Sequence, residues 1–273
     1  MPQPEKRPKK RTNPYFHGIA ALAAAALLLL VLVLCLDRPE PAPESTDPTL
    51  PPPESNPYLP EDFVYVGDYL TCTVANSRLG IDVSEHQGSI DWAQVKDAGI
   101  EFVMVRLGYR GYTEGALYED THALANLRGA REAGLQVGAY FYSQAVTVQE
   151  AKEEAKFALK VLDGMALDYP LVFDWEYVST DARTGSLDSR TLTDCTIAFC
   201  EAVEKKGYRP MVYFNQDLAA HMFKLEELTD YGFWLAMYSD EMTYPYRVEM
   251  WQYTDRGIVP GIGEKVDINL YLP

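Results

Sequence analysis

The sequence has few residues of the kinds that bind metals or form disulfides. It holds four cysteines and four histidines in 273 residues, with no Cys-x-x-Cys pair, so neither a metal site nor a cofactor is predicted. Cys195 and Cys200, on one predicted helix, are separated by a rise of about 7.5 Å, too far for a disulfide. Either can pair with Cys72, or all three are buried free thiols.

Two catalytic signatures and an excess of positive charge are also missing. No Ser lies in a Gly-x-Ser-x-Gly turn, and no Gly-rich loop leads from a strand into a helix. These absences argue against acyl transfer and nucleotide chemistry. The net charge is −16 and the pI about 4.6. Positive and negative side chains balance in the first 60 residues, so the rest of the chain is acidic and disfavours nucleic acid.

The N-terminus carries a basic cluster at 6–11 and then a run at 18–36 without any charge. Such a run predicts a transmembrane helix, with a cytoplasmic tail at 1–17 and the rest of the chain outside the cell membrane. A cleaved signal peptide, which would leave a secreted protein, is the main alternative. Leu34-Cys35-Leu36 supplies no small-x-small cleavage site.

Three further segments are predicted after the apolar run. Residues 37–60 are rich in Pro, Glu, Ser and Thr, a composition typical of an extended, disordered linker. Residues 61–77 are polar and aromatic without a clear period, and we interpret them as a lead-in that packs on the following domain. Residues 78–273 are predicted to form that domain.

Within 78–273, short apolar runs alternate with stretches of helical period. Strands are predicted at 79–83, 102–107, 137–142, 171–175, 211–214, 233–238, 248–253 and 266–272, and helices include 92–98, 118–133, 148–162 and 192–206. Gly99, Gly134 and Gly207 follow helical runs, as helix-ending glycines do. Alternation of this kind predicts a parallel sheet with right-handed crossovers.

The last three strands have no room for helices between them. Eight strands with five early helices predict an α/β fold, a modified TIM-like barrel of the (β/α)5(β)3 type. In such barrels the loops at the carboxyl ends of the strands form the site. The residues predicted at those ends are Asp82, Tyr109, Tyr142, Asp174, Glu176, Asn215, Tyr238, Trp251, Gln252, Tyr253 and Asp267.

Asp174 and Glu176 end the apolar strand at 171–175. Side chains at i and i+2 of a strand share one face and lie about 6.6 Å apart along it. Two like charges are expensive to bury on one face, which indicates a site. Carboxylates among Tyr and Trp side chains suit glycosidic bond cleavage, in which one acid gives a proton and another stabilises positive charge. Glu176 is the predicted acid, because the neighbouring Asp174 would raise its pKa.

An ordered set of motifs resembles glycoside hydrolase family 25, the Ch-type lysozymes. The resemblance covers about 79–272 and rests on Gly80-Ile81-Asp82-Val83-Ser84, Gln87-Gly88, Ile90-Asp91-Trp92, Phe102 to Arg106, Gly108-Tyr109-Arg110, Gly138 to Tyr142, Asp174-Trp175-Glu176, Trp251-Gln252-Tyr253 and Val266 to Asn269. It implies an N-acetylmuramidase that cuts peptidoglycan between N-acetylmuramic acid and N-acetylglucosamine.

The resemblance also implies roles for individual residues. Glu176 is the general acid, Asp174 is its partner carboxylate, and Asp82 and Asp267 complete an acidic floor. The expected sugar contacts are Tyr109, Tyr142, Tyr213, Tyr238, Trp251 and Gln252. Many family members have His where this chain has Phe141, so a contact through that ring is not carried over. His86 can contact substrate or fix its own loop.

The expected partners are peptidoglycan glycan strands and, through the N-terminal helix, the lipid bilayer. A monomer that remodels the wall close to its own membrane is predicted. Two alternatives stay open from the sequence. One is a membrane-tethered module that binds wall without cutting it, and the other is a different acetamido-sugar hydrolase, such as a chitinase-like enzyme. Whether the reaction uses a covalent intermediate or the substrate's own acetamido group is also open.

Overall fold

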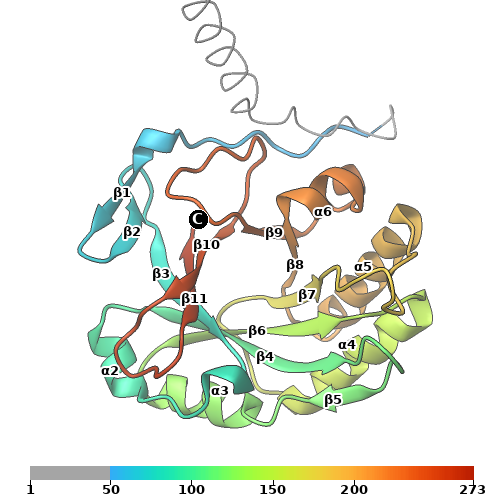
Figure 1. The fold of residues 1–273 in the computed structure, drawn as a ribbon, viewed down its shortest axis with the longest axis horizontal. Coiled ribbons are helices and arrows are strands. Elements are labelled where there is room, and N and C mark those ends of the chain that lie inside the picture. The colour runs from blue at the N-terminus through green and yellow to red at the C-terminus, as the bar shows by residue number, and fades with distance from the viewer. Residues whose placement is uncertain (1–49) are drawn as a thin grey trace, which may run out of the picture. The chain divides into compact units, whose positions relative to one another are not determined.

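Eight strands close into a barrel in the computed structural model, which describes residues 50–273 (Figure 1). The predicted tail, membrane-spanning segment and most of the linker lie outside the described residues. No helix within 50–273 is long and apolar enough to cross a membrane. The barrel strands are β3 (Arg78–Val83), β4 (Phe102–Arg110), β6 (Gln136–Ser143), β7 (Leu171–Trp175), β8 (Pro210–Asn215), β9 (Gly232–Ala236), β10 (Met250–Gly257) and β11 (Val266–Tyr271).

Strand pairing explains how the barrel closes. From β3 to β10, neighbouring strands run parallel in the order β3, β4, β6, β7, β8, β9, β10. The last strand, β11, is antiparallel to both β10 and β3 and seals the barrel between them. Because β11 runs the other way, its beginning lies at the end of the barrel where the parallel strands finish.

Five α-helices occur within the described residues. They are α2 (Trp92–Asp97), α3 (Ala123–Glu132), α4 (Val148–Leu162), α5 (Ser189–Glu204) and α6 (Gln216–His221). Side-chain oxygens cap the beginnings of α4 and α5: Thr147 accepts from the Glu150 amide at 3.2 Å, and Asp188 from the Thr191 amide at 2.9 Å. Single turns of 3-10 helix lie at Pro60–Asp62, Glu85–Gln87 and Leu225–Glu227.

The helix predicted from residue 118 begins later, at Ala123. Residues Leu117–Glu119 instead form β5, antiparallel to the end of β4. Tyr118 stacks on Tyr109 with ring centroids 5.2 Å apart. The Asp120 carboxylate then accepts the His122 amide at 2.9 Å, just before the helix. Cross-strand pairing therefore outweighs the helical period of 118–122.

Strand alternation divides the core into two layers. Along β7, Phe173 points outward and contacts Phe199 of α5, with centroids 5.3 Å apart. Val172 points inward, where it packs in a cluster that fills the barrel with Phe102, Met104, Tyr140, Tyr169, Met211, Tyr213, Trp234, Ala236 and Met250. Asp174 shares the inward face with Val172. The same alternation that builds the core therefore directs Asp174 into the barrel.

The lead-in covers strands that lack outer helices. It forms a hairpin of β1 (Phe63–Val66) and β2 (Tyr69–Cys72). The Phe63 ring packs edge-on against Trp251, with centroids 5.2 Å apart. Residues before the hairpin are also ordered against the barrel: the Arg247 amide donates to the Glu54 carbonyl at 2.7 Å. The disordered linker predicted to residue 60 is therefore wrong from about Glu54 onward, because these backbone bonds fix it.

None of the three cysteines among the described residues forms a disulfide. Cys72, Cys195 and Cys200 are all buried and free. Burial raises the pKa of Cys195 to about 12. Cys72 lies in the hairpin, whereas Cys195 and Cys200 lie on α5. The three behave as small apolar core side chains.

Candidate active site

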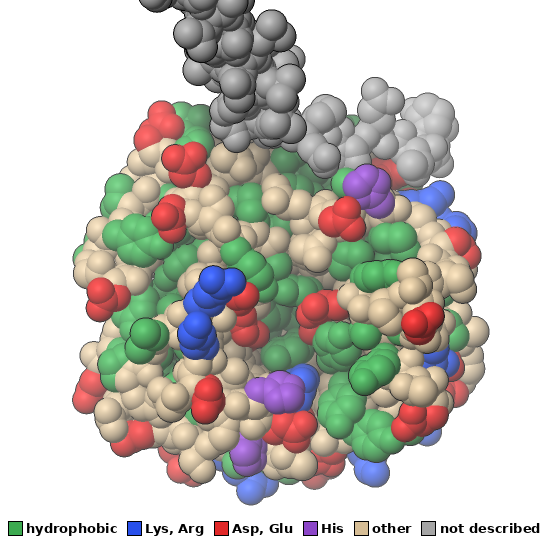
Figure 2. All heavy atoms as spheres, viewed as in Figure 1, with side chains coloured by type: hydrophobic (Ala, Val, Ile, Leu, Met, Phe, Trp, Pro, Cys, Tyr) green, Lys and Arg blue, Asp and Glu red, His purple; other side chains and the backbone are tan. Residues whose placement is uncertain are grey.

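Four carboxylates line one cavity of about 260 Å³ at the barrel end where the parallel strands finish. Asp82 comes from β3, Asp174 and Glu176 from the end of β7, and Asp267 from β11. Figure 2 shows acidic side chains beside a hollow in this face of the molecule. All four acids named from the sequence thus meet in one place.

Asp267 reaches the cavity by a route that the sequence did not predict. It is the second residue of β11, not a residue at the strand's exit. Since β11 is antiparallel to β3, Asp267 pairs directly with Asp82. Side chains of directly opposed residues project from the same face of a sheet, so both acids enter the barrel.

Asp82 is held by two amide side chains. Gln252 Nε2 and Asn269 Nδ2 each donate to Asp82 Oδ2 at 2.8 Å. Trp234 Nε1 donates to Asn269 Oδ1, also at 2.8 Å, and thereby fixes that amide. Burial raises the pKa of Asp82 to about 6, although the two donated hydrogen bonds oppose this rise. The two donated hydrogen bonds thus favour the ionised form of Asp82.

Two tyrosines orient the other end of Gln252. Tyr213 and Tyr238 donate their hydroxyls to Gln252 Oε1 at 2.9 and 3.1 Å. Both rings also line the cavity. Because its oxygen accepts from both hydroxyls, Gln252 must present its nitrogen to Asp82. Among the described residues, Gln252 thus positions Asp82 and the rings of Tyr213 and Tyr238.

Asp174 and Glu176 both hold protons more tightly than ordinary carboxyls. Burial raises the pKa of Asp174 well above its ordinary value, and the charges of Glu176 and Asp82 add to this. Its Oδ1 is buried without a hydrogen-bond partner among the described residues. Burial and then the charge of Asp82 raise the pKa of Glu176. Asp174 was predicted to raise the pKa of Glu176, but burial and the charge of Asp82 cause the rise instead.

Asp267 is the fourth acid with a raised pKa. Burial raises it to about 8, with further contributions from the charges of Asp82 and Asp255. Asp267 therefore holds its proton more tightly than an ordinary aspartate does. The cavity can hold four carboxyl groups because they do not all carry charge.

Arg106 is a cavity residue that sequence reasoning missed. It lies on β4, lines the cavity and lowers the pKa of Asp174 by its charge. Its Nε donates to Asp120 Oδ2 at 2.8 Å, and its Nη2 lies 3.4 Å from Glu85 Oε1. A charged residue inside the apolar run 102–107 was the available signal, because a buried strand rarely carries an unpaired charge.

Tyr140 and Trp234 also line the cavity without having been predicted to do so. Both belong to the inner cluster of the barrel, with ring centroids 6.0 Å apart. The neighbouring Phe141 faces outward and packs on Phe157 of α4, at 6.1 Å between centroids. Phe141 therefore does not line the cavity, and the departure from the family at this position lies in the outer layer.

Two predicted sugar contacts do not line the cavity. Trp251 is fully buried on the outer side of β10, where its Nε1 donates to the Met237 carbonyl at 2.7 Å. A sugar contact by Trp251 is incompatible with that position. Tyr109 stacks on Tyr118, and the Arg106 guanidinium lies 5.2 Å from its ring centroid. Tyr142, Tyr213 and Tyr238 do line the cavity.

The loop after β3 adds polar groups. Ser84, His86 and Gln87 line the cavity. The Ser84 hydroxyl accepts from the His86 amide at 3.2 Å, and Gln87 Oε1 accepts from the Ser84 amide at 2.8 Å. The side-chain oxygens of Ser84 and Gln87 fix the loop by accepting from these backbone amides, and His86 lines the cavity beside them.

A buried side chain supports Glu176 from behind. Gln144 Nε2 donates to the Glu176 carbonyl at 2.9 Å, and its Oε1 accepts from the Thr184 hydroxyl at 2.8 Å. Gln144 is completely buried. Next to it, the Glu154 carboxylate accepts from Ser143 Oγ at 2.6 Å and from Arg110 Nε at 2.7 Å. This network ties β6 and α4 to the segment that carries Glu176.

The arrangement suits proton transfer and stabilisation of positive charge. Among the described residues, no group of three or more His, Cys, Asp or Glu is arranged to hold a metal ion. Carboxyls with raised pKa values can donate a proton at neutral pH, and ionised Asp82 can face a developing cation.

Comparison with known proteins places this geometry in a family. The family model described as Glycosyl hydrolases family 25 matches residues 81–262. The uncharacterized protein YegX of Escherichia coli K12 is 30% identical over 205 residues, covering 70% of this chain and 68% of YegX. The autolytic lysozyme of Clostridium acetobutylicum is 27% identical over 191 residues, covering 70% of this chain and 54% of that protein.

The fold has similar solved structures. The modular autolysin LytC from Streptococcus pneumoniae, solved in complex with a synthetic peptidoglycan ligand, matches with a TM-score of 0.62 and 28% identity. The match covers 72% of this chain and 47% of LytC. This chain therefore corresponds to about half the length of that autolysin.

Proposed function

The chain belongs to glycosyl hydrolases family 25, and we propose that it is a muramidase acting on peptidoglycan. The bond cleaved is the β-1,4 link between N-acetylmuramic acid and N-acetylglucosamine. The observation that carries this proposal is the meeting of Asp82, Asp174, Glu176 and Asp267 in one cavity. A relative named as an autolytic lysozyme and a structural neighbour with a peptidoglycan ligand support the choice of substrate.

In this proposal Glu176 gives its proton to the glycosidic oxygen as the bond to the leaving sugar breaks. Burial and the charge of Asp82 raise the pKa of Glu176, which favours the protonated form required for this step. Glu176 is also partly exposed at the cavity, so the oxygen of a bound sugar can reach it. Gln144 holds its backbone in place.

Asp174 is the partner carboxylate in the same proposal. It is buried two residues before Glu176 in the chain. Its Oδ1 has no hydrogen-bond partner among the described residues. As positive charge develops on the reacting sugar, the ionised form of Asp174 becomes favoured, because an opposite charge lowers a carboxyl pKa. Asp82, ionised and fixed by Gln252 and Asn269, adds negative charge to the same site, and Asp267 lies opposite it.

The aromatic rings supply the sugar-binding surface. Tyr142, Tyr213 and Tyr238 line the cavity beside the acids. Flat rings pack against the apolar faces of pyranoses while their hydroxyls stay hydrogen-bonded. Tyr213 and Tyr238 already share Gln252 Oε1, so their ring positions are set before substrate binds.

We further propose that the enzyme is tethered to the outer face of the cell membrane and remodels nearby wall. The support is sequence alone: the basic cluster at 6–11 and the uncharged run at 18–36. Fractionation of cells that express the full chain tests this. Full-length protein in the membrane fraction is expected, and a shortened protein in the medium would contradict it.

Digestion of purified peptidoglycan tests the activity. Products are reduced with borohydride and identified by mass spectrometry, which reports the new reducing sugar. A muramidase leaves N-acetylmuramic acid at that end. New N-acetylglucosamine reducing ends would show a different glycosidase, and intact wall that still binds protein would show a module without turnover.

A further inference from the structure

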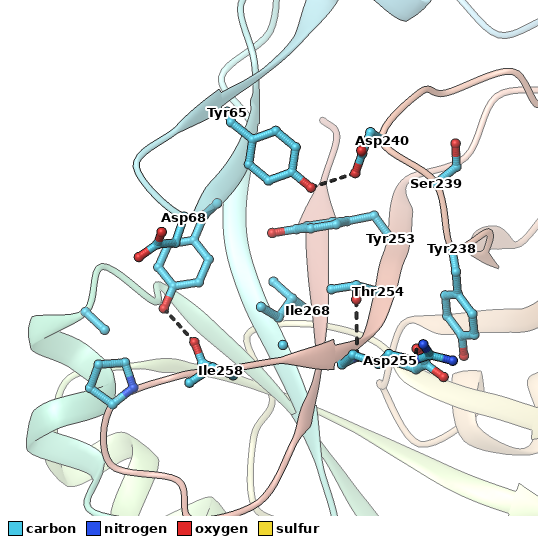
Figure 3. Close-up of a pocket in the computed structure, with 15 residues that line it drawn as sticks. Tyr65, Asp68, Tyr238, Ser239, Asp240, Tyr253, Thr254, Asp255, Ile258 and Ile268 are labelled. Atoms are coloured by element: carbon cyan, nitrogen blue, oxygen red, sulfur yellow. Dashed lines mark hydrogen bonds and ion pairs between the residues drawn. The ribbon is translucent and has the colours of Figure 1, made fainter.

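A second, larger pocket lies beside the candidate active site. Its volume is about 1050 Å³, against about 260 Å³ for the cavity that holds the acids. Most of its lining comes from the β1–β2 hairpin, the loop after β9, and the end of β10 with the connection that follows it. Figure 3 shows hairpin residues Tyr65 and Asp68 on one side of this pocket and Tyr238 on another.

The two pockets share one lining residue, Tyr238. This residue lines both, and its hydroxyl donates to Gln252, which in turn holds Asp82. Asp255 also relates the two pockets electrostatically, because it lines the larger pocket and its charge raises the pKa of Asp267, which lines the catalytic cavity. The larger pocket therefore begins at the same side chain that borders the catalytic cavity.

The size of the catalytic cavity requires such an extension. Pockets that enclose a ligand typically measure about 300–1,000 Å³, so a cavity of about 260 Å³ cannot enclose a polymer on both sides of a bond. A long substrate must continue over neighbouring surface. The larger pocket provides that surface on the Tyr238 side.

The lining of the larger pocket suits sugars. Tyr65 and Tyr238 are 50% and 56% exposed and offer ring surface. Asp68, Asp240 and Asp255 supply acceptor oxygens for hydroxyl and amide donors. Arg256, the single Lys or Arg in the described lining, lies 3.4 Å from Asp255. The resulting negative charge disfavours an acidic peptide, whereas a glycan offers hydroxyl donors and apolar ring faces.

The hairpin that completes the pocket is firmly attached. Phe63 packs on Trp251, and the Leu70 amide donates to the Tyr253 hydroxyl at 3.3 Å. Tyr65 donates its hydroxyl to Asp240 at 2.7 Å and so reaches across to the loop after β9. The family match begins only at residue 81, so the hairpin is an addition to the matched region. The hairpin, an element outside the family model, thus completes a pocket whose other lining residues lie mostly inside the matched region.

We propose that this larger pocket binds the sugars of the same glycan strand that continue beyond the catalytic cavity. The proposal rests on the muramidase function proposed above. It assigns the β1–β2 hairpin to substrate binding and makes Tyr65 a stacking platform. The proposed occupant is the glycan itself and not its stem peptides.

Binding measurements on full-length protein test the proposal. The Glu176→Gln substitution serves as background, so that turnover does not interfere. Dissociation constants are measured for long glycan strands freed of stem peptides by an amidase, and for a tetrasaccharide. Tyr65→Ala is expected to weaken binding of long strands about 3- to 10-fold, the loss expected for one aromatic contact, with little effect on the tetrasaccharide.

Two further variants separate stacking from folding. Val66→Ala changes an exposed side chain of the same hairpin on the opposite face and should leave both dissociation constants unchanged. Tyr65→Phe keeps the ring but loses the bond to Asp240, and should retain most of the affinity. Thermal unfolding of each variant reports whether the hairpin remains docked.

Three results would overturn the proposal. One is unchanged binding of long peptide-free strands by folded Tyr65→Ala. Another is an equal loss for the tetrasaccharide. The third is an effect seen only with strands that keep their stem peptides, which would make the peptide the occupant. Wild-type cleavage is assayed in parallel. Its absence would refute the proposed activity while leaving the binding comparison intact.

Discussion

Asp82 and Asp267 stand directly opposite each other where β3 and β11 run antiparallel. Like charges at directly opposed positions of a sheet repel each other. The two carboxyls avoid much of that repulsion because their pKa values differ. The pKa is about 6 for Asp82 and about 8 for Asp267. Because both acids hold their protons more tightly than ordinary aspartates, they need not both be charged in one small cavity.

Asp267→Asn should stabilise the fold above pH 6. The folded pKa of about 8 lies above the ordinary 3.8, so the contribution of protonated Asp267 to stability is complete below pH 4. That contribution is lost as the pH rises toward 8. Asn stays neutral and avoids the loss. Unfolding temperatures at pH 4, 6 and 8 should show a gap over wild type that widens with pH, and a gap independent of pH would contradict the assignment.

Much of the barrel could be predicted from the sequence, because alternation and helical period record which faces are buried. The direction of the last strand could not. The residue pattern of a short segment such as Val266–Tyr271 is equally compatible with a parallel and an antiparallel strand. Its direction is determined by its pairing with β3 and β10. Likewise, the pairing of Leu117–Glu119 with β4 depends on contacts that lie outside the segment.

The site was predictable where strand period applies. Asp174 and Glu176 share a face because they are two residues apart. The same rule shows why Trp251 and Gln252 could not both face the cavity, since adjacent residues of a strand point to opposite sides. Gln252 lines the cavity and Trp251 packs on Phe63. Residues 61–77 were predicted to pack on the domain, but the sequence did not show that a hairpin there covers the outer side of β10 at Trp251.

Trp251→Phe tests the structural position of this side chain. The variant loses the hydrogen bond to the Met237 carbonyl and leaves a small cavity against Phe63. We expect unfolding free energy in urea to fall by about 1–3 kcal/mol, with KM for peptidoglycan fragments unchanged. A severalfold rise in KM with unchanged stability would restore Trp251 as a substrate contact.

Gln144→Leu should lower turnover without weakening substrate binding. The amide supports the Glu176 carbonyl from behind and does not line the cavity, so its loss lets the proton donor shift. Small misplacements of a catalytic group reduce rates by up to about 100-fold. Steady-state kinetics should show kcat reduced about 10- to 100-fold at constant KM.

Two companion variants check the role of Gln144. Thr184→Val removes only the hydroxyl that Gln144 accepts from and should give a smaller reduction in kcat. Gln149→Leu, an exposed glutamine at the start of α4, should behave as wild type. A change in KM alone for Gln144→Leu would argue against a positioning role.

Glu176→Gln is the most direct test of the account, because it removes the proposed proton and keeps the size of the side chain. Release of new reducing ends from purified peptidoglycan is measured together with the unfolding temperature. Glu204→Gln on the exposed side of α5 serves as control. We predict that Glu176→Gln loses activity about 100- to 10,000-fold while staying folded. Activity close to wild type in the folded variant would contradict the central claim that Glu176 is the general acid.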